Sequence, residues 1–184
     1  MTLRRRELLV NGLALATGGA VLAAAAPGLA FPEPDVRRLG FNNLHTDETL
    51  DVAYWENGAY VPGALDAVNE VLRDFRTGEV HAISPHLLDL LVLLQGSLER
   101  PGRYEVISGY RSPRTNALLH TESAEVAVHS LHMEGKAIDM RLPDVGLASL
   151  RNAALGLGLG GVGYYPTSDF VHADVGRVRT WSGT

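Results

Sequence analysis

The spacing of hydrophobic residues predicts strands and helices in the first half of the chain. Alternating apolar and polar positions predict two strands between residues 37 and 55, joined by a turn at 46–48. Apolar residues then recur at helical spacing over 65–75. A second helix is expected to begin at Ser84, an N-cap residue, with Pro85 at its first position. Its leucines occupy most sides, which predicts a buried central helix.

The second half of the chain contains shorter segments of both kinds. A strand is predicted at 104–108, and Ser112 with Pro113 indicates the start of a helix that runs to about residue 122. A helix is expected near 147–155, and further strands are expected at 136–142, 162–165, 170–175 and, as an edge, 177–181. Helices mostly early and antiparallel strands late predict an α+β fold, a small antiparallel sheet with helices packed on one side.

The first 30 residues differ in character from the rest. Three arginines from residue 4 precede an apolar run rich in Ala and Gly, which ends on small residues at 28–30. These features are typical of an export signal, and paired arginines indicate the twin-arginine route. Few large apolar residues are present, so a retained transmembrane anchor is the weaker interpretation. We therefore expect a twin-arginine-type signal peptide at 1–30, a linker at 31–35 and one domain at 36–184.

Charge and cysteine content exclude several classes of function. Of the 16 basic and 21 acidic residues in the chain, the signal segment holds three and one, which leaves about 154 residues with a net charge of −7. No block of basic residues remains, so nucleic acid is not an expected partner. The chain has no cysteine, which excludes a cysteine protease and a thiolate zinc finger.

The segment SLHMEGKAID, residues 130–139, places a histidine seven residues before an aspartate. Gly135 is a poor residue for a helix interior, and the residues after it alternate as in a strand, so a turn is expected at 134–135. His132 would then end one extended segment, and Asp139 would point inward from the next. Such a geometry brings an imidazole and a carboxylate within reach of one point.

His172 lies in a later predicted strand among apolar neighbours, and Asp174 faces the same side two residues on. One interpretation is structural, with a buried neutral imidazole hydrogen-bonded to Asp174. The other combines His132, Asp139 and His172 into two imidazoles and one carboxylate. This is a ligand set of catalytic zinc sites, which keep a fourth position for water. The chain has no HExxH sequence, so the thermolysin-type arrangement is absent.

Several motifs resemble a known family. The segment at 130–139 matches the SxHxxGxAxD signature of the D-Ala-D-Ala peptidase superfamily, which includes VanX- and VanY-type peptidases, phage endolysin peptidases and the Hedgehog signalling domain. Between residues 106 and 176, four blocks closely resemble the YcbK-like branch, the murein endopeptidase K group: VISGYRSPRTNALLH, HSLHMEGKAIDMRLP, GGVGYYP and FVHADVG. The resemblance covers most of the mature chain and implies a zinc peptidase domain with a Hedgehog/D-Ala-D-Ala-peptidase-like fold.

The resemblance also implies roles for individual residues. His132, Asp139 and His172 correspond to the zinc ligands. Arg111 matches an arginine of the substrate cleft, where its guanidinium could bind a substrate carboxylate or stabilise the developing oxyanion. Without the family, a surface ion pair would be the simpler interpretation of Arg111. Ser130 matches the signature serine, which contacts substrate or shapes a turn.

The general base is the position at which the chain departs from its better-known relatives. VanX-type members have a glutamate three residues before the last ligand, and here that residue is Asp169. Other members have a histidine two residues before it, and here that residue is Phe170. Asp169 is the first candidate for the base, with His129 and Asp174 as the others. Asp174 could instead hydrogen-bond a ligand imidazole and fix its tautomer, whereas His129 is expected to stay off the metal.

Together these features predict an exported zinc peptidase of the periplasm or cell envelope, with a mature form that does not span the membrane. Its expected partners are peptidoglycan stem peptides and cross-links, and cleavage within the cross-links would make it an endopeptidase of wall remodelling. Two alternatives stay open. One is a D,D- or L,D-carboxypeptidase that trims stem peptides, and the other is a non-catalytic wall-binding module that keeps zinc for structure.

Overall fold

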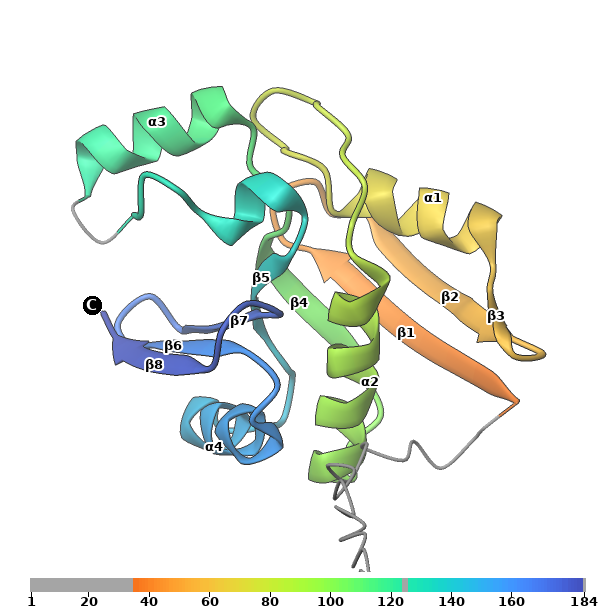
Figure 1. Ribbon diagram of the computed structural model, residues 1–184. Helices are drawn as coiled ribbons and strands as arrows, with labels where there is room; N and C mark the ends of the chain where they lie inside the picture. Colours follow the sequence, from red (N-terminus) through yellow and green to blue (C-terminus); the bar gives the residue numbers. More distant parts are fainter. Residues whose placement is uncertain (1–34, 124–125, 184) are drawn as a thin grey trace, which may run out of the picture. The chain divides into compact units, whose positions relative to one another are not determined.

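A computed structural model describes residues 35–123 and 126–183 of the chain (Figure 1). The predicted signal peptide and all but the last residue of the predicted linker lie outside the described residues. Within the described ranges, no helix is both long and apolar enough to cross a membrane.

The strands form one mixed sheet in the order β3-β2-β1-β4-β5-β7-β6-β8. They are β1 (Val36–Asn43), β2 (Thr49–Glu56), β3 (Ala59–Tyr60), β4 (Arg103–Ser108), β5 (Ala137–Arg141), β6 (Gly161–Tyr165), β7 (Phe170–Asp174) and β8 (Arg179–Ser182). β1 runs parallel to β4 and β6 parallel to β8, whereas the other neighbours are antiparallel. The α+β class is confirmed, but the sheet is larger than expected and mixed, because long connections separate β1 from β4 and allow parallel pairing.

Within residues 35–123 and 126–183, four α-helices and one short 3-10 helix accompany the sheet, and prolines begin three of them. They are α1 (Pro62–Val71), α2 (Pro85–Leu98), α3 (Pro113–Glu122), η1 (Leu131–Glu134) and α4 (Leu147–Leu157). The helix expected over 65–75 ends earlier, at Val71. Phe75 belongs instead to the following loop, where its ring stacks on His45 with a centroid distance of 3.8 Å.

The two faces of the sheet have different partners. α1, α2 and α4 contact the strands, and the leucines of α2 form the centre of the hydrophobic core, as the sequence predicts. On β5 and β7, this core contains Ile138, Met140, Val171 and Ala173. Side chains alternate along a strand, so the residues between them point to the opposite face. Figure 1 shows α3 beyond the end of β5, away from α2 and α4.

Candidate active site

His132 is held by a tight local structure rather than by a strand. The expectation that it ends an extended segment is wrong, because residues 131–134 form the 3-10 helix η1. Ser130 caps this helix, and its Oγ accepts a hydrogen bond from the His132 amide at 3.3 Å. Gly135 ends η1 with φ 63°, and a Cβ there would collide with the carbonyl oxygen of Ala82. The signature glycine is therefore required by both backbone conformation and space.

The hydrogen bonds of the two histidines determine which ring nitrogen of each remains an acceptor. His132 Nδ1 lies 2.6 Å from the carbonyl oxygen of Gly109, which only accepts, so Nδ1 carries the proton. His172 Nε2 lies 3.0 Å from Oδ2 of Asp174. That carboxylate also accepts from Arg179 and from the Gly161 amide, so Nε2 is the donor to it. Asp174 therefore accepts a hydrogen bond from the imidazole of His172, which is the second of the two positions that the sequence allowed for it.

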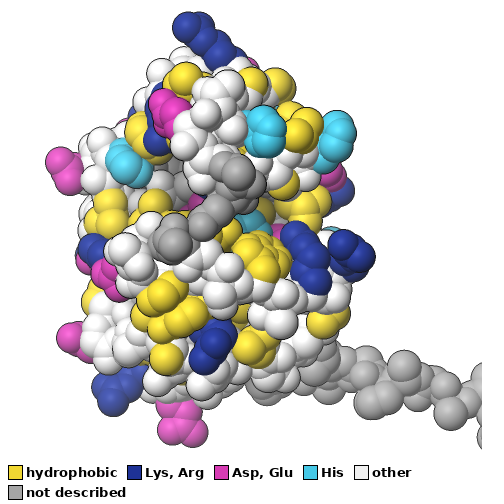
Figure 2. All heavy atoms as spheres, turned by 90° about the vertical axis from the view of Figure 1, so that its left-hand side faces the viewer, with side chains coloured by type: hydrophobic (Ala, Val, Ile, Leu, Met, Phe, Trp, Pro, Cys, Tyr) yellow, Lys and Arg dark blue, Asp and Glu magenta, His cyan; other side chains and the backbone are white. Residues whose placement is uncertain are grey.

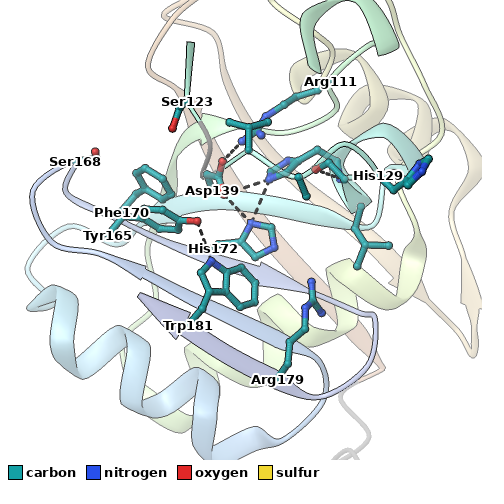
Figure 3. Close-up of a pocket in the computed structure, with 15 residues that line it drawn as sticks. Arg111, Ser123, His129, Asp139, Tyr165, Ser168, Phe170, His172, Arg179 and Trp181 are labelled. Carbon is teal, nitrogen blue, oxygen red and sulfur yellow. Dashed lines mark hydrogen bonds and ion pairs between the residues drawn. The ribbon is translucent and has the colours of Figure 1, made fainter. Parts of the chain in front are cut away.

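Three ligand atoms meet on the face of the sheet opposite the core. They are Nε2 of His132, Nδ1 of His172 and Oδ1 of Asp139, at separations of 3.2, 3.2 and 2.8 Å (Figure 3). A tetrahedral zinc ion with bonds of about 2.0–2.1 Å separates its ligands by about 3.3 Å, so the arrangement fits such an ion. The three residues, whose side chains are here called the His–Asp–His group, are 1%, 7% and 3% exposed in the same order.

The surroundings of this group favour a positive charge between its three ligand atoms. Burial, reinforced by the charge of Arg111, lowers the pKa of His132 to about 4, so its imidazole is neutral at neutral pH. Burial would raise the pKa of Asp139, but His132 and Arg111 outweigh it and hold that pKa well below its usual range. Burial lowers the pKa of His172, but hydrogen bonds to Asp139 and Asp174 outweigh it and raise that pKa. The raised pKa favours a second proton on His172, at Nδ1 facing Oδ1 of Asp139. A metal ion could take the place of that proton, which would leave Nδ1 as an acceptor.

Arg111 lies directly beside the group. Its Nη2 forms an ion pair with Oδ2 of Asp139, and its Nε donates to Oγ of Ser108 at 2.9 Å. The register of β4 shifts between Val106 and Ser108, which brings Ser108 opposite Asp139 on the same face. The side chain of Arg111 is 13% exposed, so Arg111 belongs to the site and is not a surface residue in an ion pair.

The His–Asp–His group lies in a cleft with a volume of about 370 Å³. Arg111 and the predicted substrate residue Ser130 line it, and so does Tyr165, at the strand end 164–165 that the sequence predicts as a border of the cleft. Phe170, which replaces a histidine of other members, lines it too, as do Arg179 and Trp181, which the sequence did not single out. Figure 2 looks onto this side of the molecule, where hydrophobic and histidine side chains border a hollow. The sequence feature that could have revealed Arg179 and Trp181 is the pair of glycines at 161 and 163, because these glycines leave room for the two large side chains on the neighbouring strand.

The three candidates for the general base lie in different places. Asp169 is not among the residues that line the cleft, and its Oδ2 forms an ion pair with Arg141 Nη1 at 2.6 Å. Asp174 is fully buried, and its two oxygens accept several hydrogen bonds. His129 lines the cleft, and Figure 3 shows its ring directed away from the His–Asp–His group. The geometry therefore gives no support to Asp169 as the base, and within the described residues His129 is not part of the ligand group.

Two imidazoles and a carboxylate at the bottom of a cleft are typical of a metal-dependent hydrolase. Residues 32–181 match the family Peptidase_M15_2, described as Peptidoglycan L,D-endopeptidase MepK. The chain is 41% identical over 179 residues to Peptidoglycan L,D-endopeptidase MepK of Escherichia coli strain K12. The aligned residues cover 97% of this chain and 96% of that relative. The chain is 40% identical over 182 residues to Probable peptidoglycan L,D-endopeptidase MepK of Haemophilus influenzae, with 98% and 96% covered. Among solved structures there is no significant match.

The chain therefore belongs to this family of peptidoglycan endopeptidases, which are metallopeptidases. The resemblance of its sequence motifs to the murein endopeptidase family is confirmed, and so is the expectation that the protein is a peptidase. Family membership also favours the endopeptidase over the carboxypeptidase and the wall-binding module.

Proposed function

We propose that the protein is an exported zinc peptidase that hydrolyses L,D-peptide bonds in peptidoglycan. Its relatives carry that activity in their names and match almost the whole chain. The observation that carries the proposal is the convergence of three acceptor atoms at 2.8–3.2 Å beside an open cleft. We further propose that residues 1–30 direct export by the twin-arginine route, which would bring the enzyme to the periplasm and its polymeric substrate.

The His–Asp–His group would hold the zinc ion through Nε2 of His132, Nδ1 of His172 and Oδ1 of Asp139. A bound zinc ion supplies Lewis acidity for a peptide carbonyl and lowers the pKa of a water molecule to about 7. Asp174 keeps the proton of His172 on Nε2, and the Gly109 carbonyl keeps that of His132 on Nδ1, so both ligand nitrogens retain their lone pairs.

Arg111 would act on the substrate. Its guanidinium sits beside Asp139 at the cleft, where it can donate to a carbonyl oxygen as negative charge develops on it, or to a substrate carboxylate. The hydroxyl of Ser108 accepts a hydrogen bond from the guanidinium and so fixes its orientation, which means that the Arg111 side chain needs little reorganisation during the reaction. Ser130 lines the same cleft, and its structural contribution is the cap of η1.

The test is digestion of whole sacculi by the purified mature protein, with and without a metal chelator. We expect soluble muropeptides that end at a cleaved L,D bond, no release in chelator, and recovery on addition of zinc. Release of only a terminal amino acid would indicate a carboxypeptidase. Binding to sacculi without any release would favour the wall-binding module.

A further inference from the structure

Trp181 lies on the same face of the sheet as the His–Asp–His group, in one row of paired residues. On β8 it pairs with Gly163 of β6, which pairs with His172 of β7, which in turn pairs with Asp139 of β5. The centroid of the Trp181 ring lies 5.1 Å from that of His172. The indole therefore forms a wall of the cleft directly beside the candidate metal ligands (Figure 3).

The orientation of this indole is fixed from three directions. Gly163 lies against it, and a Cβ at that position would be 2.7–2.8 Å from the ring atoms. The indole Nε1 donates to the hydroxyl oxygen of Tyr165 at 2.8 Å. The guanidinium carbon of Arg179 lies 4.8 Å from the ring centroid, and Arg179 is itself held by the buried Asp174. A side chain fixed in this way loses little entropy when a ligand packs on it.

The wall offers a flat aromatic surface in a cleft of mixed polarity. Phe170 stacks on Tyr165 with ring centroids 4.4 Å apart and extends the aromatic surface. Elsewhere the cleft is lined by arginine, serine and histidine side chains and by the smaller apolar residues Val126, Ala127 and Leu131, and Asp139 is the acidic residue among the lining residues that the structure describes. An extended peptide beside the ligand group would therefore meet charged and polar groups, small aliphatic side chains and one flat aromatic surface.

We propose that Trp181 is a specificity-determining residue that packs against the aliphatic part of a side chain next to the scissile bond. This inference rests on the proposed function, since it concerns the substrate of the same site. Peptides with a long aliphatic side chain at the contacted position bind better than peptides with alanine there, because burial against the indole removes apolar surface from water. Tyr165, which holds the indole nitrogen, acts as a positioning residue.

The experiment compares two zinc-loaded forms, the wild type and Trp181→Ala, with peptides that contain one L,D bond. Norleucine or alanine is placed in turn on each side of this bond, and kcat/KM is measured for each peptide, or the dissociation constant by calorimetry where the peptide is not cleaved. On one side of the bond, the wild type should prefer norleucine about tenfold, and Trp181→Ala should reduce this preference to about twofold or less. Trp181→Phe should keep most of it. Tyr165→Phe should weaken it by about threefold while the zinc content stays unchanged.

Trp55→Phe is the matched control, because Trp55 lies on β2 near the far edge of the sheet and is the only other tryptophan of the chain. It should leave the preference unchanged. Trp181→Gln replaces Trp181→Ala if the latter fails to fold. An equal preference in wild type and Trp181 variants would overturn the inference, as would the absence of any preference in the wild type. A Trp181-dependent preference for peptides that are not cleaved would support the inference and contradict the proposed function.

Discussion

Two buried polar clusters lie in different halves of the sheet and are built in opposite ways. In the first, here called the Asp89 cluster, Asp89 of α2 accepts hydrogen bonds from Arg37, Tyr54 and Tyr60 at 2.7–3.0 Å. Each of these contacts pairs a donor with an acceptor, and the positive charge of Arg37 faces the negative charge of Asp89. Burial and the hydrogen bond to Asp89 raise the pKa of Tyr60 to about 12, so it remains a donor at any physiological pH.

The His–Asp–His group is also largely buried but has the opposite balance. Its hydrogen-bond donors are used by Gly109 and Asp174 outside the group, so the three atoms that face one another are acceptors. Acceptors at 2.8–3.2 Å repel unless a cation lies between them. The comparison shows that burial alone does not separate a structural cluster from a functional one. What separates them is whether the donors and acceptors are matched within the cluster.

The largest effect is expected from alanine replacements of His132, Asp139 and His172. Each removes one ligand atom, so zinc affinity should fall by more than about 100-fold and hydrolysis should be lost with it. The measurement is zinc per chain after dialysis, by atomic emission. The Asp89→Asn variant, which changes the buried carboxylate of the Asp89 cluster, should keep its zinc. Stoichiometric zinc in all three alanine variants would refute the assignment.

The Asp89 cluster should respond in stability instead. Asp89→Ala removes the acceptor shared by an arginine and two tyrosines, so the free energy of unfolding should fall by about 3–5 kcal/mol. Urea unfolding of the zinc-loaded protein measures this change, and the zinc content of the folded fraction should stay the same. A loss of zinc without a loss of stability would contradict the division between the two clusters.

Asp174→Asn should weaken zinc binding without abolishing it. The amide can no longer stabilise the proton on His172 Nε2 as a carboxylate does, so zinc affinity should fall about 10- to 100-fold. Competition with a chromogenic chelator gives the dissociation constant. Asp51→Asn is the control, because Asp51 is also paired with an arginine but lies on the exposed surface. Equal affinities in wild type and Asp174→Asn would remove Asp174 from the site.

Asp74 supports the loop that carries Arg111, and its effect should depend on pH. Burial raises the pKa of Asp74, but hydrogen bonds from Thr115, Ser112 and the Arg76 amide outweigh it and lower the pKa to about 2. Because the folded-state pKa is depressed, the stabilisation is present above pH 4 and is lost as the pH falls towards 2. Asp74→Asn should therefore cost about 1–2 kcal/mol at pH 6 and much less at pH 2.5. A pH-independent difference in urea unfolding would contradict this account.

The smallest effect is expected from Asp169→Ala. Its side chain is 61% exposed and pairs with Arg141, and such exposed pairs contribute little to stability. Zinc content should be unchanged, and kcat/KM should stay within about threefold of the wild type. His129→Ala, measured in parallel, tests the candidate that lines the cleft. A loss of more than about 100-fold in Asp169→Ala, with zinc retained, would restore Asp169 as the general base.

Local signals predicted most of the helices and strands. Ser84 with Pro85 and Ser112 with Pro113 marked the starts of α2 and α3 because capping and proline preferences act within a single turn. Sheet order was not predictable in this way. The parallel pairing of β1 with β4 joins segments about 60 residues apart, and it depends on packing that involves α1 and α2.

The candidate ligands were predictable because their residue types and the SxHxxGxAxD spacing are specific. The 3-10 conformation around His132 was not, since it depends on the contact between Gly135 and Ala82 in a distant loop. Trp181 was missed for a similar reason. Its place in the cleft comes from the parallel pairing of β8 with β6, which no local pattern in the sequence reveals.

X-ray absorption spectroscopy of the zinc-loaded protein tests the central claim most directly, because it reports the atoms bound to the metal. The account predicts two imidazole nitrogens and oxygen ligands from Asp139 and water, at about 2.0–2.2 Å. It also predicts that one imidazole contribution is lost in His132→Ala and that none is lost in His129→Ala. Three imidazoles on the metal, one of them lost in His129→Ala, would contradict an open catalytic site and support a closed structural one.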